Sequence, residues 1–377
     1  MTETAFEIFL MAPPGLEPVL RDEAAQAGFA DPQLVPGGVT IRGGWPEVWR
    51  ANLVLRGAGR VSVTFASFRA MHLAQLDKRA RKLDWAAVLR PDVPVKVETT
   101  CRKSKIYHAG AATQRIEGAL TAAGIPLAAD APITLRARIE DDLATFSVDT
   151  SGEPLHKRGH KVAVGKAPMR ETLAALFLRA CGFDGTEPVL DPMCGSGTFV
   201  IEAAEIAAGL HPGRTRGFAF ESLASFDAAA WERMRAAPTG PRSTGLRFHG
   251  SDRDQGAVQN AAANAARAGV AEACQFTRAA ISDLERPEGP AGLVIVNPPY
   301  GARIGDRKLL FGLYGALGQV LMQRFGGWRV GLVTSDGGLA KATGLPWLPP
   351  GPPVPHGGLK ITLWQTAPLP HGGGGKS

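Results

Sequence analysis

Two segments of this 377-residue chain carry residue types that could hold a nucleotide-like cofactor and act on a planar base. The first segment, Asp191-Pro-Met-Cys-Gly-Ser-Gly-Thr198, follows the apolar pair Val189-Leu190. Glycine adopts positive φ and lets the backbone pass close to a ligand, and an acid at the end of a strand accepts hydrogen bonds. A Gly-x-Gly turn alone is a weak signal, because phosphate loops and ligand-free strand–turn–helix corners share it.

The surrounding residues favour S-adenosylmethionine over other nucleotide ligands. A dinucleotide fingerprint needs a third glycine where this chain has Val200, and a P-loop needs Gly-Lys-Ser/Thr, which is missing. S-adenosylmethionine has no pyrophosphate to hold. Its amino-acid end would be bound by Asp191 and its ribose hydroxyls by Asp252, while a structural turn with no ligand is the alternative. The predicted cofactor-binding residues are Asp191, Met193, Cys194, Gly195, Gly197, Thr198, Asp252 and Asn297.

The second segment, Asn297-Pro-Pro-Tyr-Gly301, follows the apolar run Leu293–Val296, which we interpret as a buried strand. An exocyclic amine on guanine or adenine is a poor nucleophile, because its lone pair is delocalised into the ring. The Asn297 side-chain oxygen and the Pro298 carbonyl would accept the hydrogens of such an amine and favour a more nucleophilic nitrogen. Two prolines stiffen the loop, and a tyrosine offers a face for a flipped-out base. The predicted catalytic residues are Asn297, Pro298, Pro299 and Tyr300; a turn with a surface tyrosine is the alternative.

The cysteines do not indicate a metal site or covalent catalysis. Cys101, Cys181, Cys194 and Cys274 are scattered and form no C-x-x-C pair, so we expect neither a disulfide framework nor a zinc site. Cys194 as the nucleophile of a C5-pyrimidine methyltransferase is disfavoured, because it lies inside the predicted cofactor turn. We predict no metal.

The net charge of +7 is concentrated in two segments. Residues 69–115 hold eleven Lys/Arg and four Asp/Glu, and residues 156–170 hold five Lys/Arg and no acid. The rest of the chain therefore sums to minus five (7 minus 7 minus 5). This distribution is compatible with a polyanion-binding surface, although solvated basic faces are common. The predicted RNA-binding residues are Arg102, Lys103, Lys105, Lys157 and Arg158.

The chain is long enough for two or three domains. It has no apolar run near the ~20 residues that span a membrane, and its start has no signal-peptide pattern, so we expect a cytoplasmic protein. No feature indicates an obligate protein partner.

The N-terminal part is predicted to form two small α+β regions, residues 1–60 and 61–152. In the first, strands at Phe6–Met11 and Val39–Ile41 flank a helix at Gly15–Ala27. In the second we expect strands at Val61–Phe65, Val93–Glu98, Ile133–Glu140 and Ala144–Asp149, and helices at Met71–Leu89 and Ala109–Ala123.

Residues 155–369 alternate strands and helices, the pattern of a doubly wound parallel sheet. We expect a helix from Pro168 to Cys181, an insertion rather than sheet at 209–245, a loop at 345–358 and a disordered tail at 370–377. The remaining expected elements are strands at Pro188–Leu190, Leu246–Gly250, Leu293–Val296, Trp328–Thr334 and Leu359–Trp364, and helices at Phe199–Ala208, Ala257–Ala268 and Leu309–Arg324.

Together these residues resemble the THUMP-domain class I methyltransferases. The resemblance covers nearly the whole chain and is carried by four motifs: Leu155-His-Lys-Arg-Gly159, Ala167-Pro-Met-Arg-Glu-Thr-Leu-Ala-Ala175, and the two segments described first. It implies a ferredoxin-like piece, a THUMP RNA-binding module and a Rossmann-like α/β catalytic domain that uses S-adenosyl-L-methionine. It also implies guanine-N2 methylation of RNA, with 23S rRNA or a large-subunit precursor as the substrate.

Two positions add detail to the resemblance. Arg303 follows the family pattern without an assigned role. Where relatives have an acid that binds the adenine amino group, this chain has Ala280, and Asp283 lies three residues on. Two alternatives remain open: an adenine-N6 DNA methyltransferase, which shares Asn-Pro-Pro-Tyr, and a catalytically decayed RNA-binding protein of ribosome assembly.

Overall fold

The computed structural model describes residues 5–161, 169–237, 245–300 and 307–371, which form two compact units. Unit 1 holds residues 5–12, 20–155 and 213–237, and unit 2 holds the remaining described residues, mainly those after Leu155. In this part of the chain, no helix combines the length and the apolar character needed to cross a membrane.

Unit 1 is built on one seven-stranded sheet of order β2-β3-β1-β4-β7-β6-β5. Its strands in that order are Gln33–Val35, Gly38–Gly43, Phe6–Met11, Val61–Arg69, Leu143–Asp149, Ile133–Glu140 and Val95–Arg102. All neighbours are antiparallel except β5 and β6. Because β1 pairs with both β3 and β4, the regions 1–60 and 61–152 share a continuous sheet, and their division into two domains stays a prediction.

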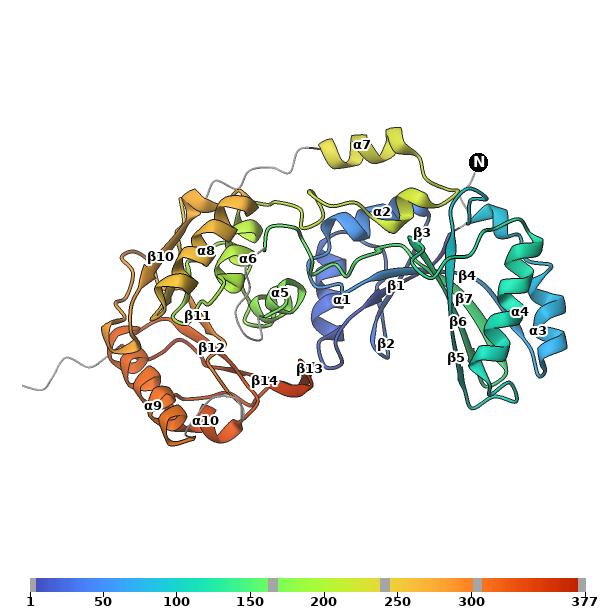
Figure 1. Cartoon of the computed structure of the whole chain (residues 1–377). Helices are drawn as coiled ribbons and strands as arrows, with labels where there is room; N and C mark the ends of the chain where they lie inside the picture. The colour runs from blue at the N-terminus through green and yellow to red at the C-terminus, as the bar shows by residue number, and fades with distance from the viewer. Residues whose placement is uncertain (1–4, 162–168, 238–244, 301–306, 372–377) are drawn as a thin grey trace, which may run out of the picture. The chain divides into compact units, whose positions relative to one another are not determined.

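The helices of unit 1 are α1 (Glu17–Gln26, which belongs to this unit from Leu20 onward), α2 (Trp45–Val54), α3 (Leu73–Ala80) and α4 (Ala109–Ala122), with a 3-10 turn, η1, at Trp85–Ala87. Figure 1 shows α3 and α4 side by side, and α4 packs against β5 at the edge of the sheet. The predicted helix at Met71–Leu89 is therefore wrong in its second half. There, Asp84 accepts a hydrogen bond from the Ala87 amide and starts the tighter turn.

Part of the predicted insertion at 209–245 belongs to unit 1, which differs from the predicted 155–369 domain. It forms a 3-10 turn, η2 (Ala219–Ser222), and α7 (Ala228–Ala236). The ring centroid of Phe220 lies 6.1 Å from that of Trp49 on α2 and 5.0 Å from that of Trp231 on α7. These aromatic side chains bury one another although they are far apart in sequence and follow no periodic pattern.

Unit 2 is an α/β domain on a second seven-stranded sheet, of order β10-β9-β8-β11-β12-β14-β13. Its strands in that order are Cys274–Arg278, Phe248–Asp252, Val189–Asp191, Leu293–Val296, Arg329–Thr334, Leu359–Gln365 and Val354–His356. The first five strands in that order, from β10 through β9, β8 and β11 to β12, are parallel to one another. β14 runs antiparallel to both of its neighbours, β12 and β13. Five strands thus form the predicted parallel sheet, whereas the last strand, β14, is antiparallel. The predicted loop at 345–358 is wrong at Val354–His356, because β13 pairs with β14 there across a turn at Gly357 and Gly358, both at positive φ.

The helices of unit 2 cover both faces of its sheet. Figure 1 shows α5 (Glu171–Ala180), α6 (Thr198–Ala207) and α8 (Gln255–Ala268) on one face, and α9 (Arg307–Arg324) and α10 (Gly337–Ala342) on the other. Short 3-10 turns η3 (Ala271–Ala273) and η4 (Ile281–Asp283) flank β10. The chain leaves β8 toward β9 on one side and returns to β11 on the other, so the strand order reverses at β8. Such a switch point opens a crevice at the carboxyl ends of the strands.

Candidate active site

The cofactor loop runs from the end of β8 into α6 and depends on glycine at two places. Gly195 and Gly197 have φ of 51° and 82°, a region that other residues adopt at a cost. A Cβ on Gly197 would also lie 3.0 Å from the Ala261 Cβ and 3.2 Å from the Phe276 ring. Gly197 donates to the Cys194 carbonyl over 2.7 Å, which closes the turn. The loop therefore brings bare backbone to the carboxyl end of the sheet, as predicted from its sequence.

Two carboxylates at adjacent strand ends hold this loop. Asp191, at the end of β8, is only 3% exposed, and its Oδ1 accepts from the Met193 amide at 3.0 Å. Asp252, at the end of β9, accepts from the Gly195 amide at 3.1 Å and from the Asp254 amide at 3.0 Å. The structure thus brings both predicted acids to one edge, each tied to the backbone beside it.

The surroundings of Asp191 suit a cationic ligand group. Burial raises the pKa of Asp191 to about 8; the Met193 amide acts in the opposite direction, and the negative charge of Asp252 adds to the increase. An ammonium group beside this carboxylate would stabilise its charged form. The residues therefore fit the amino-acid end of S-adenosylmethionine.

Cys194 is a structural part of the loop. Its amide donates to the Ser251 carbonyl at 2.9 Å, which links the loop to β9, and its side chain is buried. Burial raises the pKa of the Cys194 thiol, and the charges of Asp191 and Asp252 raise it further. A thiol that resists ionisation is a poor nucleophile, which agrees with the disfavoured cysteine mechanism.

Two residues that sequence reasoning missed support the start of α6. Lys161 Nζ donates to the Thr198 hydroxyl and to the Met169 carbonyl, both at 2.8 Å, and lies 3.5 Å from the Glu171 carboxylate. Thr198, predicted to bind cofactor, therefore already has a partner. Asn264 of α8 is fully buried and donates to the Ser196 carbonyl at 3.0 Å. Nothing in the spacing of either residue indicates these contacts.

The acceptor loop begins at Asn297, directly after β11 and next to β8 in the sheet. The Asn297 Oδ1 atom is buried, and no hydrogen bond reaches it from the described residues. A buried amide oxygen without a donor costs about 1–3 kcal/mol, so such an atom indicates a missing partner. Pro298 is buried, and Tyr300 is half-buried against the core that α9 covers.

Tyr314 on α9 fixes the middle of this loop and was not predicted. Its side chain is fully buried, and its hydroxyl lies 3.3 Å from the Pro299 carbonyl oxygen and 3.3 Å from the Thr334 hydroxyl. Thr334 Oγ1 accepts from the Asp336 amide, so it can donate to the tyrosine, which in turn donates to Pro299. The acceptor loop is thereby tied to β12.

Other residues singled out from the sequence are less informative in the structure. Gly301 and Arg303 lie outside the described residues. Ala280 is exposed just after β10, and Asp283 is an exposed acid whose Oδ1 accepts from the Ser282 hydroxyl at 3.1 Å.

Comparison with known proteins identifies the catalytic unit. Residues 158–345 match the family described as "RMKL-like, methyltransferase domain", and residues 7–62 match the "RlmL ferredoxin-like domain". The chain belongs to the RMKL-like methyltransferase family. It is 33% identical over 337 residues to the ribosomal RNA large subunit methyltransferase K/L of Vibrio cholerae, a match covering 85% of this chain and 48% of that protein. The chain thus spans about half the length of this relative.

Solved structures with the same arrangement include methyltransferases of different described specificity. SMU.472, described as a methyltransferase complexed with SAH, is 28% identical with a TM-score of 0.86 and covers 98% of this chain and 99% of its own. A protein of Listeria monocytogenes described as a predicted N6-adenine-specific DNA methylase is also 28% identical, with a TM-score of 0.86 and 97% coverage of each chain. TrmN from Thermus thermophilus, at 20% identity and TM-score 0.73, shares the fold.

In this RMKL-like methyltransferase, three predicted RNA-binding residues lie at the end of β5 and on the turn that follows it; we call residues 102–108 the basic turn. Arg102 is 71% exposed at its side chain, and Lys103 and Lys105 are exposed as well. The Lys105 amide donates to Asp142 Oδ1 at 2.8 Å, which anchors the turn. Tyr107 on the same turn is 85% exposed and was not predicted, although an aromatic residue within a basic run is a recognisable signal.

The prediction that Arg158 binds RNA is wrong. Its side chain is 2% exposed and ion-paired to Glu202 and Glu205, two buried acids of α6. A guanidinium held in this way does not face a phosphate. Lys157 beside it is exposed and keeps its predicted role as a proposal.

The described residues contain no group of three or more His, Cys, Asp or Glu side chains placed to hold a metal ion. In the same ranges all four cysteines are free thiols.

Proposed function

We propose that this methyltransferase transfers the methyl group of S-adenosyl-L-methionine to the exocyclic N2 amine of a flipped-out guanine in 23S rRNA. The names of its relatives support this substrate, and the SAH bound to SMU.472 is what that cofactor leaves after methyl transfer. The observation that carries the proposal is the buried Asn297 Oδ1, which has no donor among the described residues. An amino group can donate the hydrogen bond that this oxygen does not receive.

The acceptor loop supplies the chemistry of activation. Asn297 Oδ1 and the Pro298 carbonyl would each accept a hydrogen bond from the target amine, which draws its lone pair out of conjugation with the ring. Tyr300, half-buried beside them, offers the stacking face. When bound, S-adenosylmethionine would supply an electrophilic methyl group and leave as S-adenosylhomocysteine, while the methylated amine would lose one proton to solvent. The chain itself would orient the amine toward that methyl group.

The cofactor loop would position the other reactant. Asp191 would bind the ammonium group and Asp252 the ribose hydroxyls, while Gly195, where an added Cβ would meet nothing within 4 Å, leaves room for the ligand beside the backbone. Gly197 would contribute through the turn, because the place of its missing side chain is filled by Ala261 and Phe276. Met193, Cys194 and Thr198 complete the proposed contact set by their place on the loop. Thr198 would contribute mainly by anchoring α6, because Lys161 already donates to its hydroxyl.

RNA binding is proposed for the basic turn and Lys157. Arg102, Lys103 and Lys105 offer cations to phosphates, and Tyr107 offers a ring to an unpaired base. We further propose that residues 61–152 form a THUMP RNA-binding module after a ferredoxin-like region at 1–60. A cytoplasmic location stays a prediction.

The test is methyl transfer from radiolabelled S-adenosylmethionine. Ribosomal RNA from a strain lacking this protein should accept label that nuclease digestion and mass spectrometry place at guanine N2, whereas duplex DNA should accept none. Label at another base or position would contradict the substrate proposal.

A second candidate, adenine-N6 methylation of DNA, is favoured by the description of the Listeria monocytogenes protein. The acceptor loop would serve an adenine amine equally well, because N6 carries the same two hydrogens. Label in duplex DNA and none in ribosomal RNA would establish this candidate in place of the first.

A further inference from the structure

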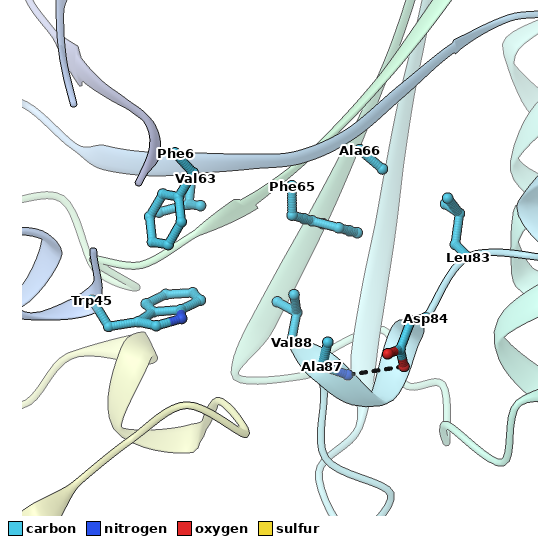
Figure 2. A pocket seen from close by; sticks show the side chains of 9 residues that line it. All are labelled: Phe6, Trp45, Val63, Phe65, Ala66, Leu83, Asp84, Ala87 and Val88. Atoms are coloured by element: carbon cyan, nitrogen blue, oxygen red, sulfur yellow. Dashed lines mark hydrogen bonds between the residues drawn. The ribbon is translucent and has the colours of Figure 1, made fainter. Parts of the chain in front are cut away.

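Unit 1 has a recess of about 420 Å³ that plays no part in the proposed chemistry. Its walls come from several elements: Phe6 on β1, Trp45 at the start of α2, Phe65 on β4, and Asp84 just before η1. Figure 2 shows the aromatic rings and the Asp84 carboxylate facing a common space. Volumes of this order suit small organic ligands.

The aromatic walls are held in fixed orientations. The Phe6 and Trp45 rings meet edge to face with centroids 5.2 Å apart, and Phe65 meets the buried Trp85 in the same way at 5.9 Å. Phe6, Trp45 and Phe65 are each only half-buried, so part of every ring is accessible. Rigid, partly exposed aromatic faces are suited to planar ligands.

Asp84 gives the recess one charged hydrogen-bond acceptor. Its Oδ1 accepts from the Ala87 amide at 3.3 Å, which fixes the side chain, and the carboxylate is exposed to solvent (Figure 2). A planar ligand held between these rings would meet the carboxylate at its edge. Such a ligand needs N–H donors there, and two adjacent donors would use both oxygens.

The charge around the recess selects among ligands with those donors. Residues 69–115, which include part of the recess wall, carry eleven Lys/Arg against four Asp/Glu, and the exposed Lys82 directly precedes Leu83 in that wall. A methylated lysine peptide would fit aromatic rings and a carboxylate, but its cationic charge is disfavoured here. A nucleic acid brings phosphates that these cations attract. Of the four bases, guanine alone presents two adjacent N–H donors, N1–H and N2–H, on its Watson–Crick edge.

We propose that this recess binds an unpaired guanine of the RNA substrate, stacked on Trp45 and Phe65 and hydrogen-bonded to Asp84. The inference rests on the proposed RNA substrate but concerns a binding site separate from the methyl-transfer residues. Its role is to hold the substrate by a single-stranded segment.

The test is fluorescence anisotropy with labelled nine-nucleotide RNAs whose central base is G, inosine, A or U in a uridine background. The wild-type chain should bind the G oligomer about tenfold more tightly than the U oligomer, because only guanine can donate two hydrogen bonds to the Asp84 carboxylate, and hydrogen bonds to a charged group are the stronger kind. Inosine, which lacks the N2 amine, should bind at an intermediate level. Trp45→Leu and Asp84→Asn should each reduce the preference for G to threefold or less.

A matched control comes from the same strand. Phe6→Leu removes a recess ring and should weaken the G preference, whereas Phe9→Leu, three residues on and packed over Gly38 on the other face of β1, should leave it intact. Circular dichroism of each variant checks that unit 1 remains folded. A 6-thioguanosine oligomer should photo-cross-link to the peptides that hold Trp45 or Phe65.

Several results would overturn the proposal: no preference for G, a preference that survives Trp45→Leu and Asp84→Asn, or binding of a trimethyl-lysine peptide in place of RNA. Failure of the proposed function is distinguishable, because methyl transfer is measured separately. Loss of the G preference with intact methylation of ribosomal RNA removes the recess proposal alone.

Discussion

The candidate active site of unit 2 and the basic turn of unit 1 place their polar groups in opposite environments. In unit 2, Asp191 and Asn297 are taken out of water, and one of them lacks a donor. On the basic turn, the side chains of Lys103 and Lys105 remain in water. The turn is anchored by the hydrogen bond that the Lys105 backbone amide donates to the Asp142 carboxylate. Buried groups act only at one geometry, whereas exposed cations attract phosphates over several ångströms.

This difference shows how far RNA-binding residues can be predicted from the charge of a sequence segment. Arg158 and Lys103 both come from segments with an excess of basic residues, yet Arg158 is buried against Glu202 and Glu205 while Lys103 is exposed. Burial of an arginine requires paired acids, because an unpaired charge costs several kcal/mol there. The acids that pair Arg158 lie 44 and 47 residues on and belong to another element. Counting local charge therefore overestimates the RNA-binding surface.

The largest expected effect is that of Asn297→Ala. Loss of the buried acceptor should lower kcat by about 10²–10³-fold, the usual consequence of removing one transition-state hydrogen bond. RNA affinity should change less than twofold, since the basic turn is untouched. Single-turnover methyl transfer and anisotropy measure the two quantities.

Asn260→Ala, which removes an exposed asparagine of α8, is the control and should alter neither quantity. Unchanged turnover in Asn297→Ala would remove the proposed mechanism. Lost turnover in the wild type with retained RNA binding would favour the catalytically decayed alternative.

The second expected effect is a pH dependence of SAH affinity that arises from the Asp191 carboxyl group. Without an ammonium partner its pKa is raised to about 8, so binding the ammonium group of SAH below that pH must release the proton. The SAH affinity should therefore rise up to tenfold per pH unit between pH 6 and 7.5 and level off above 8. Isothermal titration calorimetry in buffers of different ionisation enthalpy measures both the affinity and the released proton.

The same shift has a consequence for stability. Because the folded state holds the Asp191 proton more tightly than the unfolded chain, this contribution is fully present below the unfolded pKa and is lost as pH rises through about 8. The ligand-free chain should thus lose more Tm between pH 5 and 8 than Asp191→Asn does. Equal Tm profiles, or an SAH affinity independent of pH, would show that Asp191 is ionised throughout.

Local spacing was sufficient to predict the loops but not the residues that brace them. Asp191, Gly195, Gly197 and Asn297 stand at strand ends, where the sequence itself shows an apolar run followed by a turn, and the structure brings them to one edge of the sheet. Their roles toward cofactor and base remain proposals.

The bracing contacts depend on packing between distant elements. Lys161 reaches Thr198 across 37 residues, and Asn264 reaches Ser196 across 68. No periodic pattern encodes such pairs. The strands β10 and β13 were missed for a related reason: they are short edge strands, and β10 is rich in polar residues.

The third expected effect concerns RNA binding by the exposed basic turn. Lys103→Gln/Lys105→Gln should weaken RNA binding about three- to tenfold at moderate salt and reduce the slope of log K against log salt by about 1.5. The matched control, Arg90→Gln/Lys96→Gln, removes two cations that are already paired to Asp92 and Glu98. It should leave the slope nearly unchanged. Equal slopes for both variants would place the phosphate contacts elsewhere.

The smallest expected effect is that of a substitution at Tyr314, which contacts the acceptor loop but is not proposed to contact the base. Tyr314→Phe keeps the packed ring but removes the hydroxyl between Pro299 and Thr334. The cost of one such hydrogen bond, about 0.5–1.5 kcal/mol, predicts a two- to tenfold fall in kcat. If the hydroxyl positions the acceptor loop, KM for RNA and Kd for SAH should stay unchanged while kcat falls. A matching fall in Tm with full kcat would assign Tyr314 to stability alone, and the acceptor loop would then be rigid through its two prolines.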